Sequence, residues 1–255
     1  MKLENSVFLI SGAGSGLGAA VAAMAVEAGA RAVLLDVNAD RGEALAAQLG
    51  DVTRFVLTDV ANPQEGERAV STAIDAFGHI DVLVNCAGVA PGEKIIGREG
   101  PHSLESFART VTINLVGTFN MLRLAADAMA KQQPGQTGER GVIVNTASVA
   151  AFEGQIGQAG YAASKGGVAA LTLPAARELA RHAIRVMAIA PGIFETPMMA
   201  GMPQDVQDAL GASVPFPPRL GRPSEYAALV RHIVENPMLN GEVIRLDGAL
   251  RMPPR

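Results

Sequence analysis

Short apolar runs rich in β-branched residues alternate along this chain with longer alanine-rich stretches, and this alternation limits the fold more than any other feature. The runs are Val7–Ile10, Ala32–Leu35, Arg54–Leu57, Val82–Val84, Val142–Val144, Arg185–Ile189 and Val243–Leu246. Continuous apolar strands indicate burial on both faces of a parallel sheet. The pattern therefore predicts a doubly wound, Rossmann-like α/β fold with a parallel sheet of about seven strands flanked by helices.

The stretches between the runs predict the main helices at Gly18–Ala28, Ala39–Leu49, Pro63–Phe77, Leu104–Lys131, Tyr161–His182 and Ser224–Glu235. No linker or shift in composition divides the chain, so we expect a single domain over residues 1–255. The Pro- and Met-containing segment 193–222 is too long for a simple connection, and such loops often cover active sites. We expect a substrate lid around residues 194–218, with an apolar lining from Met198, Met199, Met202, Val214 and Phe216.

Composition excludes several classes of protein. Hydrophobic residues make up 49% of the chain and charged residues 18%, which is enough to fill a core and argues against disorder. No stretch approaches the roughly 18 uncharged apolar residues of a membrane-spanning helix, so no membrane association is expected. The net charge of −4 argues against nucleic acid as a partner.

Cysteine and histidine usage points to a reducing compartment and to no metal. Cys86 is the only cysteine, so an intrachain disulfide cannot form. The polar start of the chain does not resemble a targeting segment, which favours the cytoplasm and leaves the mitochondrial matrix open. The histidines lack the spacing of metal ligands and lie at His79, His102, His182 and His232.

A glycine-rich loop follows the first apolar run and opens the first predicted helix. Its sequence is SGAGSGLG over residues 11–18, with the spacing G-x-x-x-G-x-G from Gly12, Gly16 and Gly18, and with Ser15 and Leu17 between them. Glycines let backbone amides approach a pyrophosphate, and the helix N-terminus favours its negative charge. The alternative is an ordinary glycine-rich turn.

An acidic residue, Asp36, ends the second run. A carboxylate at this position can accept hydrogen bonds from the adenosine ribose and would repel the extra phosphate of NADP. The alternative is a helix-capping aspartate. Arg41, five residues further along, is too far in sequence to be a good phosphate clamp. Together with the glycine loop, Asp36 predicts that the cofactor is NAD.

Tyr161 and Lys165 stand at i and i+4, on one face of a predicted helix. A free tyrosine has a pKa near 10, and a nearby ammonium lowers this pKa, so the pair suits proton exchange with an alcohol or ketone. Ser148 lies 13 residues earlier, just after an apolar run, where α/β folds place ligands. A solvated helix face is the alternative for the pair.

These motifs resemble those of the short-chain dehydrogenase/reductase family. The matches are the glycine loop, Asn85–Gly88, Asn114, Ser148, Tyr161, Lys165 and Pro191–Gly192. The resemblance implies that Tyr161 is the general acid/base and that Ser148 holds and polarises the substrate oxygen. It also implies that Lys165 lowers the Tyr161 pKa and binds the nicotinamide ribose, and that Asn114 holds a proton-relaying water.

The resemblance further implies a set of cofactor contacts. Asp59 and Val60 match the pair that reads adenine, and Cys86 and Gly88 lie where the backbone passes the adenosine. For Cys86, a role as a small buried apolar residue is favoured over redox chemistry. Contacts at the nicotinamide end are expected from Pro191, Phe194 and Thr196.

A narrower likeness covers much of the second half. Residues 142–158 read VIVNTASVAAFEGQIGQ and residues 239–248 read LNGEVIRLDG. These stretches are similar to the type II 3-hydroxyacyl-CoA dehydrogenases, also called 17β-hydroxysteroid dehydrogenase type 10. The implied reaction interconverts a 3-hydroxyacyl-CoA and a 3-oxoacyl-CoA with NAD, and Gln155 is either a substrate-pocket residue or a surface glutamine. The loop Pro91–His102 diverges, which leaves substrate chain length open.

Three other functions compete with this interpretation. A 3-oxoacyl-acyl-carrier-protein reductase would use NADPH, which Asp36 disfavours, and would dock its carrier on basic residues such as Arg109 and Arg123. A broad secondary-alcohol or hydroxysteroid dehydrogenase would share the site. A non-catalytic NAD-binding scaffold would not need the intact site residues. In related enzymes the two longest helices pair between subunits, which implies a homotetramer with two-fold interfaces.

Overall fold

The computed structural model describes residues 1–98, 100–135, 137–201 and 203–254, and it contains one seven-stranded parallel sheet. The strands are β1 (Val7–Ser11), β2 (Arg31–Asp36), β3 (Thr53–Leu57), β4 (Val82–Asn85), β5 (Gly141–Thr146), β6 (Ile184–Pro191) and β7 (Val243–Leu246). Their order in the sheet is β3-β2-β1-β4-β5-β6-β7. The chain therefore changes direction between β1 and β4, which is the position where doubly wound sheets bind ligands.

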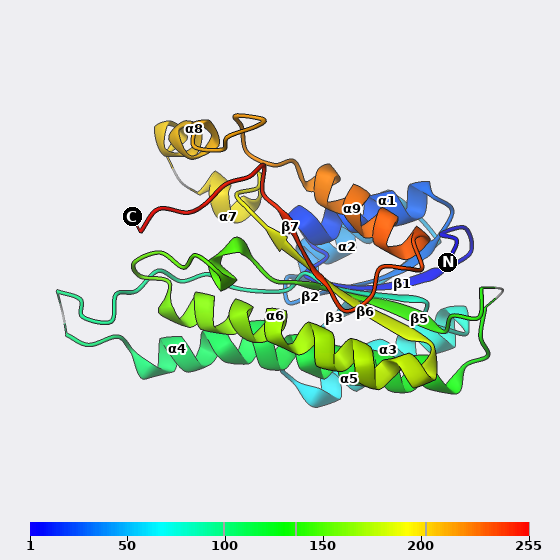
Figure 1. Cartoon of the computed structure of the whole chain (residues 1–255). Helices are drawn as coiled ribbons and strands as arrows, with labels where there is room; N and C mark the ends of the chain where they lie inside the picture. The colour runs from blue at the N-terminus through cyan, green and yellow to red at the C-terminus, as the bar shows by residue number, and fades with distance from the viewer. Residues whose placement is uncertain (99, 136, 202, 255) are drawn as a thin grey trace.

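Two layers of helices cover the sheet (Figure 1). One layer contains α1 (Gly16–Glu27), α2 (Ala39–Leu49) and α9 (Pro223–Glu235), and the other contains α3 (Pro63–Phe77), α4 (Leu104–Val111), α5 (Gly117–Lys131) and α6 (Ala159–Leu179). Two short helices, α7 (Pro197–Ala200) and α8 (Gln204–Ala212), stand apart from both layers at one end of the sheet.

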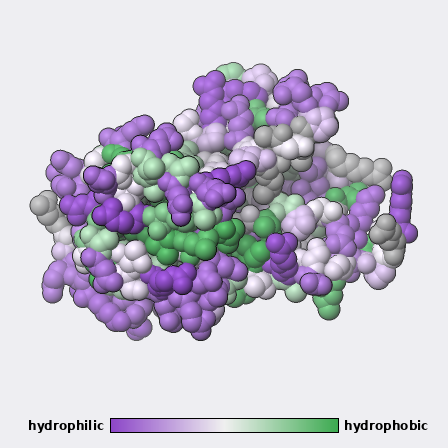
Figure 2. Space-filling model, turned by 180° about the vertical axis from the view of Figure 1, so that it is seen from behind, coloured by the Kyte–Doolittle hydropathy of each residue, from purple (hydrophilic) through white to green (hydrophobic). Residues whose placement is uncertain are grey.

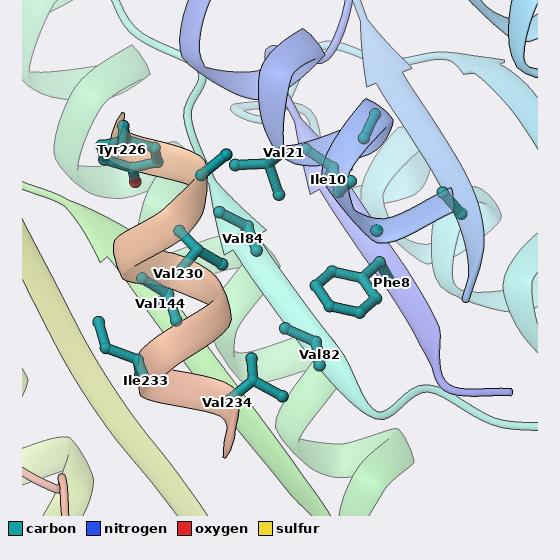
Figure 3. Close-up of a cluster of buried hydrophobic side chains, with 14 of the residues drawn as sticks. Phe8, Ile10, Val21, Val82, Val84, Val144, Tyr226, Val230, Ile233 and Val234 are labelled. Carbon is teal, nitrogen blue, oxygen red and sulfur yellow. The ribbon is translucent and has the colours of Figure 1, made fainter. Parts of the chain in front are cut away.

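The core lies on both faces of the central strands. Figure 3 shows Phe8 and Ile10 of the first strand packed with Val230 and Ile233 of α9. Every residue of β1, β4, β5 and β6 is buried. The edge strands differ from the expected continuous burial, because no further strand covers their outer side: Leu57 in β3 is 50% exposed, and all of β7 is half-buried.

The structure confirms the predicted seven strands and main helices, with two differences in the helical segments. The predicted helix Leu104–Lys131 is interrupted by a π-helical turn, Thr112–Val116, that separates α4 from α5. The predicted helix Tyr161–His182 ends in a short 3-10 turn, Ala180–His182. π-helical turns inside α-helices occur often at functional sites, and the sequence pattern alone did not reveal this one.

Polar and apolar side chains are distributed unevenly over the surface. Seen from the side opposite to Figure 1, a band of hydrophobic residues crosses the middle of the molecule between hydrophilic flanks (Figure 2). None of the helices in the described part of the chain is long and apolar enough to cross a bilayer. Within the described ranges, no group of three or more His, Cys, Asp or Glu side chains is placed to hold a metal ion.

Candidate active site

A cleft of about 830 Å³ opens at the carboxyl ends of the strands. Its walls come from the segments that follow the first six strands, β1 to β6, together with α6. All but one of the residues predicted from the sequence as site residues line it, namely Gly12, Ser15, Gly16, Leu17, Gly18, Asp36, Asp59, Val60, Cys86, Gly88, Ser148, Gln155, Tyr161, Lys165, Pro191, Phe194 and Thr196. The exception is Asn114, which is fully buried beside the cleft.

The glycine loop forms one end of the cleft, where only glycine fits the backbone. Gly12 has a φ of +66°, and a Cβ atom on it would lie 2.6 Å from the backbone nitrogen of Ala87. Gly16 has a φ of +54°, and a Cβ atom on Gly18 would collide with the carbonyl oxygen of Gly12. No side chain caps the first turn of α1, which begins directly after Ser15. The loop therefore presents backbone amides and a helix N-terminus to an anionic group.

The Asp36 carboxylate is fixed beside this loop by two backbone amides. Its Oδ2 atom accepts a hydrogen bond of 2.8 Å from the Gly14 nitrogen, and its Oδ1 atom accepts one of 2.9 Å from the Asn38 nitrogen. Arg41 and Asp36 both lie against the backbone of Gly14. A Cβ atom built on Gly14 would lie 2.9 Å from Asp36 Oδ2 and 3.3 Å from the Arg41 Cβ atom, so the two residues are neighbours in space.

The floor of the cleft near β3 and β4 is formed by the residues expected to contact adenosine. The Asp59 carboxylate accepts a hydrogen bond of 2.9 Å from the Ala61 nitrogen. The Cys86 thiol lies 3.6 Å from the Thr146 hydroxyl, and burial raises its pKa. A thiol with a raised pKa stays protonated, which fits the interpretation of Cys86 as a small, partly buried residue without redox chemistry.

Tyr161 and Ser148 meet in the cleft, one from α6 and the other from the end of β5. Burial raises the pKa of the Tyr161 phenol, and a hydrogen bond with the Ser148 side chain partly opposes this rise. The Ser148 hydroxyl also accepts a hydrogen bond of 3.1 Å from the Ala150 nitrogen, which orients it. The phenol is therefore protonated near neutral pH and is available to donate a proton.

Lys165 lies one turn of α6 beyond Tyr161. Its Nζ atom is 5.9 Å from the centre of the Tyr161 ring and donates a hydrogen bond of 2.6 Å to the Thr146 carbonyl oxygen. Burial lowers the pKa of Lys165 to about 8. The resemblance implied that Lys165 lowers the pKa of Tyr161. In this structure burial has the largest influence on that pKa and raises it, and the Ser148 hydrogen bond opposes the rise.

Asn114 is buried in the π-helical turn between α4 and α5. Its side chain accepts a hydrogen bond of 2.8 Å from the Val89 nitrogen and donates bonds of 2.8 Å to the Val89 carbonyl and 3.0 Å to the Ser164 hydroxyl. These bonds tie the segment after β4 to α6. The sequence predicted that Asn114 lies within a helix, but it did not predict the two hydrogen bonds between the Asn114 side chain and the Val89 backbone.

The expected lid segment contains both α7 and α8. Phe194, Thr196, Met199 and Leu210 line the cleft. Val214 and Phe216, which were expected in the lining, are not among the residues that line it: Val214 is buried and Phe216 is 79% exposed. Met202 and the side chain of Met198 lie outside the described part of the structure.

Sequence reasoning missed further lining residues, among them Arg109, Gln158 and Met252. Arg109, considered above as a residue that could dock a carrier, is exposed and also lines the cleft. Met252 comes from the C-terminal tail, which is far from the other lining residues in sequence.

The site fits a nicotinamide dinucleotide. The cleft runs from the glycine loop and Asp36 to Ser148 and Tyr161, and side chains on the loop glycines would fill the space beside the helix N-terminus. A fixed carboxylate suits ribose hydroxyls, and a phenol with a neighbouring hydroxyl suits the oxygen of an alcohol or ketone. The arrangement is that of an oxidoreductase.

The chain belongs to the short chain dehydrogenase family, whose sequence model matches residues 6–207. It is 52% identical over 254 residues to a 3-hydroxyacyl-CoA dehydrogenase type-2 from Drosophila melanogaster, covering 99% of this chain and 100% of the relative.

Solved structures agree with this assignment. A 3-hydroxyacyl-CoA dehydrogenase type-2 from Mycobacterium avium superposes with a TM-score of 0.94 at 39% identity, covering 100% of this chain and 98% of that one. A 3-ketoacyl-(acyl-carrier-protein) reductase from Brucella melitensis, solved in complex with NADH, superposes with a TM-score of 0.88 at 31% identity, covering 98% and 100%. The family assignment and the fold predicted from the sequence are thus confirmed.

Proposed function

We propose that this oxidoreductase interconverts 3-hydroxyacyl-CoA and 3-oxoacyl-CoA with NAD(H). The main support for this substrate class is the 52% sequence identity, over 99% of the chain, to a relative that is named as a 3-hydroxyacyl-CoA dehydrogenase. The cleft supports it, because apolar residues of α7 and α8 line the same cleft as the Tyr161 phenol. The reductase that acts on acyl-carrier-protein substrates is more distant, at 31% identity.

A nicotinamide held in the cleft would supply the hydride that is exchanged with C3 of the substrate. Tyr161 and Ser148 both direct hydroxyl groups at the substrate oxygen, so that in the reductive direction Tyr161 donates its proton as negative charge develops there. Ser148 stabilises the same oxygen by a hydrogen bond, and such preorganised donors are worth several kcal/mol. Lys165, whose Nζ atom donates a hydrogen bond of 2.6 Å to the Thr146 carbonyl, has further N–H groups that would donate to a ribose hydroxyl of the cofactor.

NAD rather than NADP is the proposed cofactor because of Asp36. Its carboxylate oxygens already accept two backbone amides and retain lone pairs for ribose hydroxyls. A phosphate on that ribose would lie next to a negative charge. Asp59 and Val60 are proposed to contact the adenine, and Phe194 and Thr196 the nicotinamide end.

We also propose a homotetramer. The α5 helix and the turn before it expose Phe119 and Val116 by 47% and 48%, and Leu173 of α6 is 44% exposed. Large apolar side chains on neighbouring helices are a typical subunit contact. Sedimentation velocity of the purified chain tests this assembly, and a monomer at micromolar concentration would refute it.

The decisive experiment is NADH oxidation by the purified protein with acetoacetyl-CoA. We expect turnover with NADH, much weaker turnover with NADPH, and a loss of about 10²–10⁴-fold in kcat for Tyr161→Phe. The variant should bind NADH as the wild type does, because the phenol hydroxyl serves proton transfer. If the wild type binds NADH but does not reduce acetoacetyl-CoA, the proposed substrate class is wrong.

A further inference from the structure

The C-terminal tail, residues 250–254, forms part of the wall of the cleft. Figure 1 shows this tail in red, leaving β7 and running past α7. Met252 is the tail residue that lines the cleft, where Met199 and Leu210 of the expected lid segment also line it. Tail and lid segment thus both contribute apolar side chains to the cleft that also holds Ser148 and Tyr161.

Three contacts join the tail in register to the loop after β5. The Met252 nitrogen donates to Glu153 Oε2 at 3.2 Å, and Gln155 Nε2 donates to the Pro253 carbonyl at 3.1 Å. The Ile156 nitrogen donates to the Pro254 carbonyl at 3.0 Å. Because this loop also carries Gln155 into the cleft, the position of the tail and the position of the loop are fixed together.

A cluster of four charges anchors the base of the tail. Arg245 binds Glu153 through two parallel hydrogen bonds of 2.9 and 3.0 Å and binds Asp247 at 2.7 Å. Arg251 completes the cluster, at 3.3 Å from both carboxylates. The side chain of Asp247 is only 7% exposed and those of Arg245 and Glu153 about one-fifth exposed, so solvent screens these pairs less than surface pairs.

We propose that the tail determines substrate specificity, with Met252 contacting the acyl chain and Glu153 holding the tail in place. This inference rests on the proposed function, because it assigns the acyl chain of that substrate to the tail side of the cleft. Met252 touches substrate in this assignment, whereas Glu153 is a positioning residue. Methionine is suited to such a wall because its side chain adapts to chains of different shape.

The first test measures reduction of acetoacetyl-CoA and of 3-oxodecanoyl-CoA by Met252→Ala. Burial of one methylene group strengthens binding about fourfold, so we expect KM for the longer substrate to rise about tenfold when the methionine side chain is truncated. The variant's kcat for the longer substrate should change less than twofold, and KM for acetoacetyl-CoA should rise less than KM for the longer substrate, because a shorter acyl chain buries less apolar surface against Met252. Met238→Ala, at a methionine that is 90% exposed and lies outside the cleft lining, is the matched control. An equal effect on both substrates, or none, overturns the proposal.

The second test concerns Glu153. Glu153→Gln should raise KM for the longer substrate as Met252→Ala does, and trypsin should cleave the Arg251–Met252 bond at least fivefold faster, as read by mass spectrometry. Glu235→Gln, which removes a carboxylate from the exposed pair with Arg231, is the control and should change neither. Unchanged cleavage together with unchanged KM would show that the charge cluster does not position the tail.

The outcome for the tail can be separated from that for the proposed function. Wild-type reduction of acetoacetyl-CoA tests the proposed function by itself. If the wild type reduces methyl ketones but no CoA ester, the proposed function fails, and the same chain-length comparison on the ketones still decides the role of the tail. A wild type that reduces neither class overturns both.

Discussion

Replacing Asp36 by serine should change the preferred cofactor. In the wild type this carboxylate is held by the amides of Gly14 and Asn38 at 2.8 and 2.9 Å, so it cannot turn away from a phosphate on the neighbouring ribose. Serine removes the charge and shortens the side chain. The backbone of Gly14 lies next to both the Asp36 carboxylate and the Arg41 Cβ atom, so the substitution leaves a cationic residue on this side of the site.

The expected magnitude has two parts. Two like charges about 4 Å apart repel by about 1 kcal/mol in water and about 4 kcal/mol at an effective dielectric constant of 20. Asp36 is half-exposed, so a value near the lower end, about 2 kcal/mol, applies to NADPH. Loss of a charged hydrogen bond to the ribose weakens NADH by about 1.5 kcal/mol. The sum, about 3.5 kcal/mol, corresponds to a shift of a few hundredfold in the preference for NADPH over NADH.

The assay is the ratio of kcat/KM for NADPH and NADH, measured with one ketone substrate in low and high salt. Asp40→Ser is the matched control, because it removes an exposed carboxylate from the first turn of α2, outside the residues that line the cleft. The shift should shrink in high salt if repulsion contributes. A ratio that changes less than threefold in Asp36→Ser, or equally in both variants, would refute the reasoning.

Three further predictions follow from single sites. Gly12→Ala should abolish NADH binding in a fluorescence titration, because the new Cβ would lie 2.6 Å from the Ala87 nitrogen at a φ of +66°; an unchanged Kd would contradict this. Because the pKa of Lys165 is lowered to about 8, kcat/KM for ketone reduction should fall as pH rises through about 8. The free energy of unfolding should rise between pH 8 and about 10.4, because in this range only the unfolded chain still holds the Lys165 proton. Lys165→Met should remove both trends. Arg185→Met should lower the free energy of unfolding by about 1–3 kcal/mol in urea denaturation, because it leaves the Ile233 and Val234 carbonyls without the guanidinium donor, while Glu139 keeps the N-terminal ammonium at 2.9 Å; an unchanged free energy of unfolding would contradict this.

The sequence was informative wherever a local pattern encodes the structure. Apolar runs identified the strands because a buried parallel strand needs continuous apolar residues, and the two edge strands, β3 and β7, departed from full burial. The glycine spacing, Asp36 and the Tyr161–Lys165 pair were found because each depends on residues that are close in sequence and therefore keep a fixed relation on a turn or helix.

Contacts between residues that are far apart in sequence were visible only in the tertiary structure. The π-helical turn at Asn114 arises where its side chain clamps Val89, 25 residues away, and no periodicity in α4 and α5 signals that contact. Met252 lines the cleft, and the tail that carries it follows a bidentate ion pair between Arg245 and Glu153, which are 92 residues apart. The pKa of Tyr161 likewise follows from its burial, which is a property of the assembled cleft. Local sequence thus determined the strands, the helices and the set of reactive groups, whereas packing between distant segments determined the environment in which those groups act.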